Sequence, residues 1–381
     1  MERLYLDHNA TTPRRAEARA EYLRELDRLG GNPSSVHTSG RAARVVLDLA
    51  RERAAAALGV HEDELVFTSG GTESVHLALL GALKVAPAGG LVTTVVEHSA
   101  VLGAAELAGT MGRPVAHVGV DAAGRVDLAQ LVSRARDGAA LVSLQTANNE
   151  VGTVHPVGKL VAELETRGER PLVHTDAVQA LGRVPVELRA WRVDLASFSA
   201  HKLGGPLGVG LLYKRKGVRL APLLVGGGQE GGLRPGTENV PAIAAAACAL
   251  ELAVAERAQQ AVAWRASTSE LWRQLQSKVP DVRLNGPEID ASDRLPNTLN
   301  VTLPGSDGRT LVARLDLEGL EVSAGSACAS GSLEPSHVLL AMGRSPEAAR
   351  AGLRLSLGRT TRGEDVHKAV EILSRIRHAL R

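Results

Sequence analysis

The stretch Leu65-Val66-Phe67-Thr68-Ser69-Gly70-Gly71-Thr72-Glu73 decides the fold. Its first three residues are typical of a short buried strand, and after the glycine turn a helix carries Leu77, Leu80 and Leu83 on one side. A glycine turn between a strand and a helix presents backbone N–H groups at the helix N-terminus, where the helix dipole favours an anion such as a phosphate. A Ser/Thr cap followed by flexible glycines explains the same residues equally well.

Strand-like and helix-like segments alternate on both sides of this stretch. The helical spacing of Val45, Val46 and Leu49 predicts a helix over residues 38–57, and Gly59 ends it. Further apolar strand candidates lie at residues 91–96, 140–145, 171–174, 193–198 and 208–213. This alternation is typical of an α/β domain with a mostly parallel sheet.

The composition changes beyond residue 239. Residues 239–278 are rich in Ala, Glu, Gln and Leu, which predicts long helices that leave the first domain. The last predicted elements are strands near residues 298–303 and 352–356 and a helix over residues 363–380. Because 381 residues exceed one ordinary hydrophobic core, we predict a second, smaller domain over about residues 257–381.

Composition and charge exclude several classes of protein. The 44 Lys and Arg residues against 42 Asp and Glu leave a net charge of +2, and aromatic residues make up 2%, so no nucleic-acid partner is expected. Two cysteines are too few for a disulfide scaffold or a four-ligand zinc site, so we expect no metal centre and a reducing compartment. The N-terminus lacks an apolar signal core and no apolar run reaches membrane-spanning length, which predicts a cytoplasmic protein without a membrane partner.

Polar residues follow two neighbouring predicted strands. Asp176 ends one strand, with Gln179 three residues on, and the next strand runs into Ser199, His201 and Lys202. An Asp in such a place is usually a helix N-cap, and a lone strand-end lysine is usually a surface residue. Together with the glycine turn, however, these residues match the needs of a pyridoxal phosphate (PLP) enzyme: a Schiff-base lysine, a carboxylate for the pyridine nitrogen and donors for the phosphate.

The two cysteines have different surroundings. Cys328 lies in the small-residue stretch 323–332, which offers little packing and predicts a reactive thiol that travels to a substrate. Cys248 lies in an alanine-rich segment and is typical of a small buried hydrophobe. Arg354, on a predicted strand, suits a substrate carboxylate, although a surface ion pair explains it equally well.

Together, these segments resemble the cysteine desulfurases, which are PLP-dependent fold-type I enzymes of the class V aminotransferase group. The resemblance covers nearly the whole chain. Besides the segments above, it rests on residues 5–13, 32–35, 148–152 and 234–239. The loop 323–330 is similar to the branch whose cysteine stands in a Ser-Gly-Ser-Ala-Cys context, rather than to the branch with paired histidines before it.

The resemblance implies the architecture in more detail. We expect a large PLP-binding domain over residues 13–256 with a mostly parallel, seven-stranded type of sheet. Residues 1–12 and 257–381 are expected to form a small α/β domain that carries the mobile cysteine loop 323–332. The active form is expected to be a homodimer.

The resemblance also implies a role for each candidate residue. Lys202 binds PLP covalently, Asp176 pairs with the pyridinium nitrogen, Gln179 contacts the ring hydroxyl, and His98 stacks on the ring and transfers protons. The phosphate is held by Gly71, Thr72, Ser199, His201 and the partner subunit's Thr237. Asn149 and Arg354 bind the substrate carboxylate.

The implied reaction converts L-cysteine to L-alanine. The Cys328 thiolate attacks the substrate sulfur and keeps it as a persulfide, which passes to a sulfur-acceptor protein that serves iron–sulfur clusters or another thiocofactor. Gly231, Leu207, Val75 and His76 depart from the family's usual residues and lower the positive charge around the site. These departures leave the catalytic efficiency and the choice of acceptor open.

Two other interpretations stay open. The first is another PLP reaction on the same fold, namely a selenocysteine lyase or a small-substrate aminotransferase. Cys328 disfavours an aminotransferase, because that reaction has no use for a nucleophilic thiol. The second is a sulfur-carrier hub that mainly binds partners and has weak turnover of its own.

Overall fold

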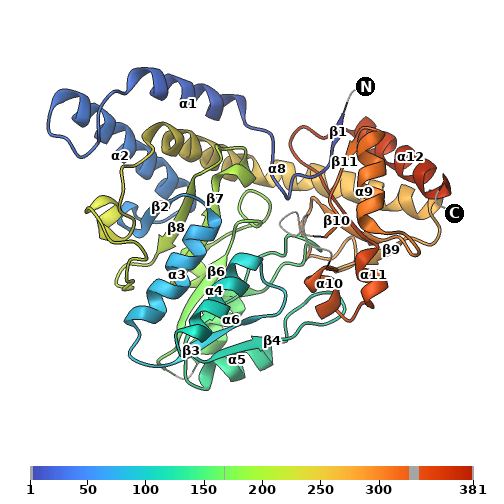
Figure 1. Cartoon of the computed structure of the whole chain (residues 1–381), viewed down its shortest axis with the longest axis horizontal. Coiled ribbons are helices and arrows are strands. Elements are labelled where there is room, and N and C mark those ends of the chain that lie inside the picture. Colours follow the sequence, from blue (N-terminus) through green and yellow to red (C-terminus); the bar gives the residue numbers. More distant parts are fainter. Residues whose placement is uncertain (1–2, 167, 326–333, 380–381) are drawn as a thin grey trace.

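The structure of the chain is a computed structural model, which describes residues 3–166, 168–325 and 334–379. The predicted nucleophile Cys328 lies outside the described residues. Figure 1 shows a large sheet covered by helices and, beside it, a smaller group of strands and helices. Within the described ranges, no helix combines the length and the apolar character that crossing a membrane requires.

The large sheet has seven strands in the order β2-β8-β7-β6-β5-β3-β4. They are β2 (Leu65–Thr68), β3 (Gly90–Thr94), β4 (Val115–Val118), β5 (Ala139–Ser143), β6 (Leu172–Asp176), β7 (Leu195–Ser199) and β8 (Gly210–Lys214). The strands from β4 to β7 pair in parallel, whereas β8 runs antiparallel to both β7 and β2. The predicted α/β class with a mostly parallel sheet is therefore confirmed.

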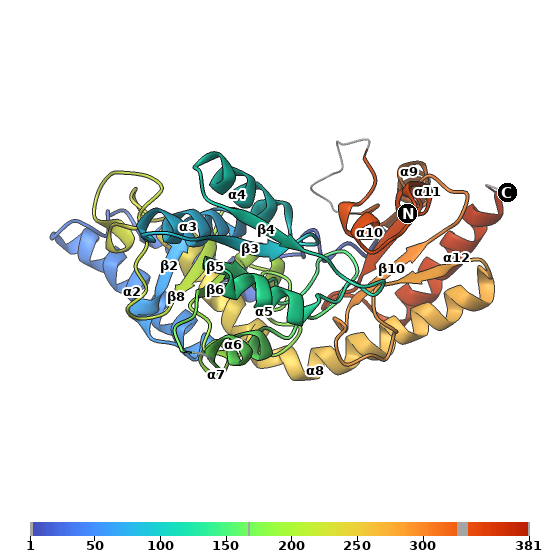
Figure 2. The ribbon, with the colours of Figure 1, turned by 90° about the horizontal axis from the view of Figure 1, so that it is seen from below.

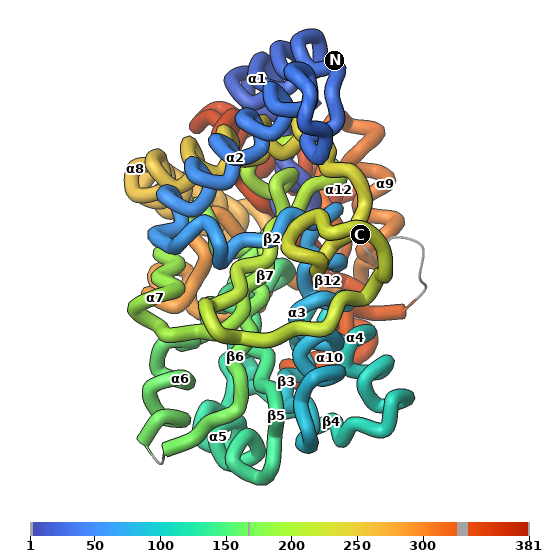
Figure 3. Tube along the Cα trace, turned by 90° about the vertical axis from the view of Figure 1, so that its left-hand side faces the viewer, coloured from blue at the N-terminus to red at the C-terminus, as the bar shows by residue number. Residues whose placement is uncertain are grey.

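Helices cover both faces of this sheet (Figures 2 and 3). The helices α3 (Gly71–Val85) and α4 (Ser99–Thr110) lie on one face, and α5 (Leu128–Arg136), α6 (Val157–Glu165) and α7 (Leu188–Trp191) lie on the other. Neighbouring residues of the same strand pack in different cores. On β5, Leu141 packs with α3 and α4, whereas Val142 packs with α5 and α6. On β7, Leu195 and Ala196 divide in the same way. Side chains alternate between the two faces of a strand, so each strand of a sheet that is buried on both faces has a continuous apolar sequence.

The predicted helix over residues 38–57 is α2 (Thr38–Leu58), and Gly59 ends it with a left-handed φ of +67°. Its buried side carries Leu47 and Leu58 together with several alanines, and it leaves two of the apolar residues that predicted the helix exposed. Val45 and Leu49 are 56% and 51% exposed, whereas Val46 and Ala50 are buried. Small side chains on the buried face let α2 pack closely against α8.

The smaller part contains an antiparallel sheet in the order β12-β10-β9. Its elements are β9 (Arg283–Asn285), β10 (Thr298–Thr302), α9 (Gly308–Leu317), α10 (His337–Ala341), α11 (Pro346–Arg350), β12 (Gly352–Ser356) and α12 (Gly363–Ala379). β1 (Leu4–Tyr5) pairs in parallel with β11 (Leu320–Glu321), and Leu6 is buried with Leu299 and Leu355. The N-terminal segment therefore belongs to this second core, and the strands and helix predicted for this region are confirmed.

One helix, α8 (Val240–Lys278), joins the two parts. Its 39 residues replace the several long helices predicted there. Leu250 packs in the core of the large sheet, and Leu271 and Leu275 pack in the second core. The remaining elements are α1 (Ala16–Arg28), η1 (Glu62–Glu64), η2 (Ala200–Leu203) and η3 (Gln229–Gly232). The predicted boundary between residues 256 and 257 falls inside α8, and the division into domains stays a proposal.

Candidate active site

The carboxyl ends of the parallel strands meet at one cavity. Asp176 and Ser199 are the last residues of β6 and β7, and His98 follows β3. The predicted site residues that line this cavity are Gly71, Thr72, His98, Asn149, Asp176, Gln179, Ser199, His201, Lys202 and Arg354. The carboxyl ends of parallel strands lie at the same edge of a sheet, and open α/β folds bind ligands there. In this chain the cavity brings together predicted site residues that lie up to 283 positions apart in the sequence.

Lys202 lies in the turn that follows β7. Its backbone belongs to η2, and Gly204 closes that turn with a left-handed φ of +83°. A Cβ atom at Gly204 would lie 2.9 Å from the Arg15 side chain, so a larger residue does not fit there without movement. The Lys202 ammonium donates hydrogen bonds to the carbonyls of Ala10, at 2.7 Å, and Asn9. The N-terminal segment thus positions the lysine amine within the cavity.

Asp176 presents a buried carboxylate to the same cavity. Its Oδ1 accepts a hydrogen bond of 2.9 Å from the Val178 N–H, and no helix begins at this residue, so the helix N-cap interpretation is wrong. Burial raises the pKa of Asp176, while the hydrogen bond from the Val178 N–H and the charge of Lys202 partly oppose this effect. A cationic ring N–H that binds this carboxylate would offset the cost of its burial.

The N-terminus of α3 forms a glycine cradle. Its N-cap is Gly70, so no side chain caps the helix, and the Ser/Thr-cap interpretation is wrong. A Cβ atom at Gly71 would lie 3.0 Å from a Val178 methyl and 3.5 Å from the Ser199 Cβ. The first N–H groups of a helix have no intrahelical acceptor, so this end of α3 can receive an anion.

His98 is the N-cap of α4, and its Nδ1 accepts a hydrogen bond of 3.1 Å from the Ala100 N–H. A neutral imidazole that accepts at Nδ1 carries its proton on Nε2. The preceding Glu97 is completely buried, and its Oε1 accepts a hydrogen bond of 2.8 Å from the Gln145 N–H. Burial raises the pKa of Glu97 well above its usual value, and the charge of Asp176 adds to this effect, so the protonated form of Glu97 is favoured next to His98.

Arg354 extends from β12 into the cavity and is 1% exposed. It donates from Nη1 to the Asn149 carbonyl at 3.0 Å and from Nη2 to Oδ1 of Asp7 at 2.7 Å. The side chains of Arg354 and Asp7 are 1% and 16% exposed, so the pair is largely buried and the surface-pair interpretation is wrong. Asp7 was not predicted as a site residue.

Two amides connect the N-terminal segment to the cavity. Gln179 donates from Nε2 to the Asn9 carbonyl at 2.9 Å, and its buried Oε1 has no hydrogen-bond partner within the described residues. Asn9 donates from Nδ2 to the Asn149 carbonyl at 3.2 Å. Asn9 also lines the cavity, so it is a site residue that the motif over residues 5–13 contained but that sequence reasoning left without a role.

His201 is neutral in this arrangement. Burial and the charges of Lys202 and Arg183 lower the pKa of its imidazole to about 4. Its Nδ1 lies 3.1 Å from the Thr11 hydroxyl oxygen. The ring can therefore form hydrogen bonds without bringing a further charge into the cavity.

Two predicted residues are not placed in the cavity. Thr237 is exposed on the loop before α8 and does not line it, and Cys328 lies outside the described residues. The second cysteine, Cys248, is 6% exposed in α8, which confirms that it is a buried small side chain.

These residues fit PLP. The cofactor has an anionic phosphate, a ring nitrogen that binds a carboxylate, and an aldehyde that condenses with a lysine amine. The cavity offers an uncapped helix N-terminus, the buried carboxylate of Asp176 and the amine of Lys202 for these three groups.

Comparison with known proteins gives concordant matches. The model of the class-V aminotransferase family matches residues 4–369. The chain is 41% identical over 383 residues to "Cysteine desulfurase IscS" of Dictyoglomus turgidum, covering 99% of this chain and 95% of that protein. It is also 41% identical over 380 residues to the protein of the same name from Methanosarcina thermophila, covering 99% and 93%.

Solved structures are similar over the same span. A "NifS-like protein" superposes with a TM-score of 0.91 at 38% identity, covering 98% of this chain and 99% of that chain. The structure described as "SspA in complex with cysteine" superposes with a TM-score of 0.76 at 31% identity, covering 93% and 98%.

Proposed function

The chain belongs to the class-V aminotransferase family, and from this membership we propose that it is a PLP-dependent cysteine desulfurase of fold type I. It converts L-cysteine to L-alanine and transfers the sulfur. The observation that carries this function is the single cavity that holds Lys202, Asp176, the α3 N-terminus and Arg354. That cavity provides for a covalently bound PLP and for the carboxylate of an amino acid.

The proposed cofactor contacts follow from the cavity. Lys202 binds PLP covalently, Asp176 binds the ring nitrogen and Gln179 the ring hydroxyl, and His98 stacks on the ring. The phosphate is assigned to Gly71, Thr72, Ser199, His201 and the partner subunit's Thr237. When bound, PLP supplies an electron sink that weakens bonds at the α-carbon of an amino acid.

Arg354 and Asn149 bind the substrate carboxylate. A guanidinium matches a carboxylate with two parallel N–H···O bonds, which fixes the amino acid in orientation as well as in place. Arg354 is 1% exposed, so water competes little for its N–H groups. The Asn149 backbone is itself held by Arg354 and Asn9, which keeps this side of the cavity rigid.

His98 holds a proton at Nε2. The Ala100 N–H occupies the lone pair of Nδ1, so the neutral ring presents Nε2–H as a donor. We propose that this is the proton that His98 transfers in the reaction. Burial of Glu97, which raises its pKa, disfavours a negative charge beside the ring.

Cys328 is the proposed nucleophile. Its thiolate forms an S–S bond to the substrate sulfur while the substrate C–S bond breaks. The carbon fragment keeps the electron pair of that bond and leaves, after protonation, as L-alanine. The placement of Ser323 supports this assignment, because this residue at the start of the cysteine loop binds the same Asp7 carboxylate as Arg354.

The persulfide sulfur passes to an acceptor protein, and iron–sulfur clusters or another thiocofactor are its proposed destination. We also propose a cytoplasmic homodimer. Exposed apolar side chains around the loops between residues 204 and 237 support the dimer, since Leu207, Leu224 and Val225 are 63%, 60% and 97% exposed in the single chain.

The experiment that tests this function measures alanine and sulfide from L-cysteine, with and without a thiol reductant. A desulfurase releases both in equal amounts when the reductant is present and the purified enzyme is the only protein. Alanine release that requires an added partner protein would favour the carrier hub. Release of alanine from L-selenocysteine but not from L-cysteine would favour a selenocysteine lyase.

A further inference from the structure

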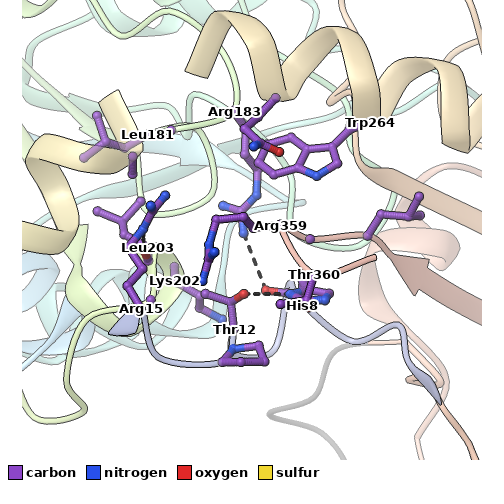
Figure 4. Close-up of a pocket in the computed structure, with 17 residues that line it drawn as sticks. His8, Thr12, Arg15, Leu181, Arg183, Lys202, Leu203, Trp264, Arg359 and Thr360 are labelled. Atoms are coloured by element: carbon purple, nitrogen blue, oxygen red, sulfur yellow. Dashed lines mark hydrogen bonds between the residues drawn. The ribbon is translucent and has the colours of Figure 1, made fainter. Parts of the chain in front are cut away.

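A second cavity lies next to the active site and shares only Lys202 with it, among the described residues. Figure 4 shows this cavity, which we call the Arg183–Arg359 cavity. Its walls come from the N-terminal segment, the turn after β6, the turn after β7, helix α8 and residues 357–360. None of these walls includes a residue outside the described ranges.

The lining of this cavity is strongly cationic. Arg15, Arg183, Lys202 and Arg359 all contribute, and no Asp or Glu of the described chain lines it. Arg15 is neutralised from outside the cavity, because it forms two hydrogen bonds of 2.9 Å with the Glu256 carboxylate. Lys202 is the proposed attachment point of PLP. Arg183 and Arg359 remain, and neither has an acidic partner within the described residues.

Arg183 is a buried charge without a counter-ion. It is 5% exposed, and it donates to two carbonyls, those of Gln179 at 2.9 Å and His8 at 3.5 Å. Carbonyl oxygens satisfy N–H groups but leave the net charge uncompensated. Buried charges in proteins are as a rule paired, because an unpaired one is costly. Burial accordingly lowers the pKa of Arg183 to about 10.

His8 provides a second, independent sign of a missing partner. His8 is 1% exposed, with Nδ1 2.6 Å from the Thr12 hydroxyl oxygen and a buried Nε2 that has no hydrogen-bond partner among the described residues. Burial and the charges of Arg183 and Arg359 lower the pKa of His8 to about 4. Both arginines therefore act on the same ring, consistent with their neighbouring positions in Figure 4.

We propose that the Arg183–Arg359 cavity binds a small oxyanion, as the carboxylate or phosphate group of a small molecule. Guanidinium groups bind both kinds of oxyanion through paired N–H donors. The side chains of Thr12, Thr360 and Gln260 line the same cavity and add neutral donors. An anion bound there would compensate Arg183, whose charge acts on His201 and Arg354 of the active site.

Calorimetric titration of the PLP-loaded enzyme tests this proposal. Inorganic phosphate, acetate and chloride are titrated separately at constant ionic strength, with PLP bound so that its own phosphate site is filled. Saturable binding of phosphate, of acetate or of both, but not of chloride, shows an oxyanion site, and the variants below distinguish the Arg183–Arg359 cavity from the proposed substrate-carboxylate site at Arg354. The preferred anion distinguishes a phosphate ligand from a carboxylate ligand.

Variants locate the binding. Arg359→Gln removes an exposed cation and leaves the core untouched, and Arg183→Gln is paired with Arg183→Lys, which keeps the charge. We expect the dissociation constant of the anion to be about tenfold larger in Arg359→Gln and in Arg183→Gln, and to change less in Arg183→Lys. The matched control is Arg362→Gln, because Arg362 pairs with Glu364 and does not line the cavity.

The proposal is overturned if neither oxyanion binds saturably, or if Arg359→Gln binds as tightly as the unaltered enzyme. Circular dichroism and the visible band of bound PLP check that each variant is folded and loaded. If Arg183→Gln does not fold, Arg359→Gln alone decides the question.

Discussion

Asp7 and Arg354 form a largely buried ion pair across 347 positions of the sequence, with Oδ1 of Asp7 2.7 Å from Nη2 of Arg354. The other carboxylate oxygen, Oδ2, accepts a hydrogen bond of 2.9 Å from the Ser323 hydroxyl. One carboxylate thus holds the proposed substrate-binding arginine and the start of the loop that carries Cys328. Asp7 is a positioning residue, because it acts on the substrate through Arg354.

Asp7→Asn should weaken substrate binding. The amide cannot balance the buried guanidinium, so Arg354 loses its charge-assisted partner and its fixed orientation. We expect KM for L-cysteine to rise about tenfold or more, with the visible band of bound PLP unchanged. The matched control is Asp316→Asn, which removes an acid that pairs with Arg3 at the surface. An unchanged KM in Asp7→Asn would show that Asp7 does not position Arg354.

Lys202→Ala should abolish covalent attachment of PLP. The purified, PLP-supplemented enzyme should show a visible absorption band that borohydride removes, because a Schiff base between PLP and a lysine is reducible. Treatment of the variant with borohydride should leave no PLP covalently attached to the protein. Lys159→Ala is the control, since Lys159 is exposed on α6. A reducible band that survives in Lys202→Ala would move the attachment to another lysine.

Buried histidines should make the free energy of unfolding fall with acidification. Burial lowers the pKa of His174 to about 3 and that of His155 to about 4. Each pKa lies below the value of about 6.5 in the unfolded chain, so the unfolded state binds more protons between about pH 4 and pH 6.5. Stability from these groups is complete above about pH 6.5 and is lost as the pH falls, by about 1.4 kcal/mol per pH unit for each histidine.

His174→Asn tests this dependence. His174 lies between the hydroxyls of Ser143, at 2.8 Å from Nδ1, and Ser197, at 2.9 Å from Nε2. Asparagine keeps hydrogen-bonding groups but does not titrate. Urea unfolding at pH 7, 6 and 5 should show a smaller slope of stability against pH in this variant. His117→Asn, at an exposed position of β4, should keep the original slope. Equal slopes in all three proteins would contradict the prediction.

Sequence reasoning succeeded where local pattern determines structure. The central strands are buried on both faces and read as apolar runs, and the order strand, glycine turn, helix identified the cradle at Gly71. It missed β4 and β9, which are short strands at sheet edges and lack a continuous apolar run. The apolar spacing of Val45 and Leu49 predicted the helix α2 correctly, but it did not predict which side is buried, because both residues are more than half exposed.

The site contacts that sequence reasoning missed are long-range. Nothing near Asp7 or Asn9 in the sequence indicates that one binds Arg354 and that the other accepts a hydrogen bond from Lys202. These contacts depend on the N-terminal segment crossing from the second core to the edge of the large sheet. Glu97 had a local signal, since an acid between a buried strand and His98 is unusual, but its burial depends on how β3 and β5 pack.

The two cysteines allow the sharpest test of the mechanism, because they are the only thiols in the sequence. Cys328→Ser should still bind PLP and L-cysteine, since those steps are assigned to Lys202, Asn149 and Arg354. It should lose persulfide formation and alanine release, because a hydroxyl is a far poorer nucleophile toward sulfur.

Cys248→Ser is the matched control, with the same change of sulfur to oxygen. Because Cys248 is 6% exposed in α8, this variant should keep its activity and lose about 1–2 kcal/mol of stability at most. Mass spectrometry after one turnover without reductant should find one added sulfur on Cys328 and none on Cys248. Since burial keeps Cys248 away from substrate, an added sulfur on that residue, or full desulfurase activity in Cys328→Ser, would overturn the assignment of the nucleophile.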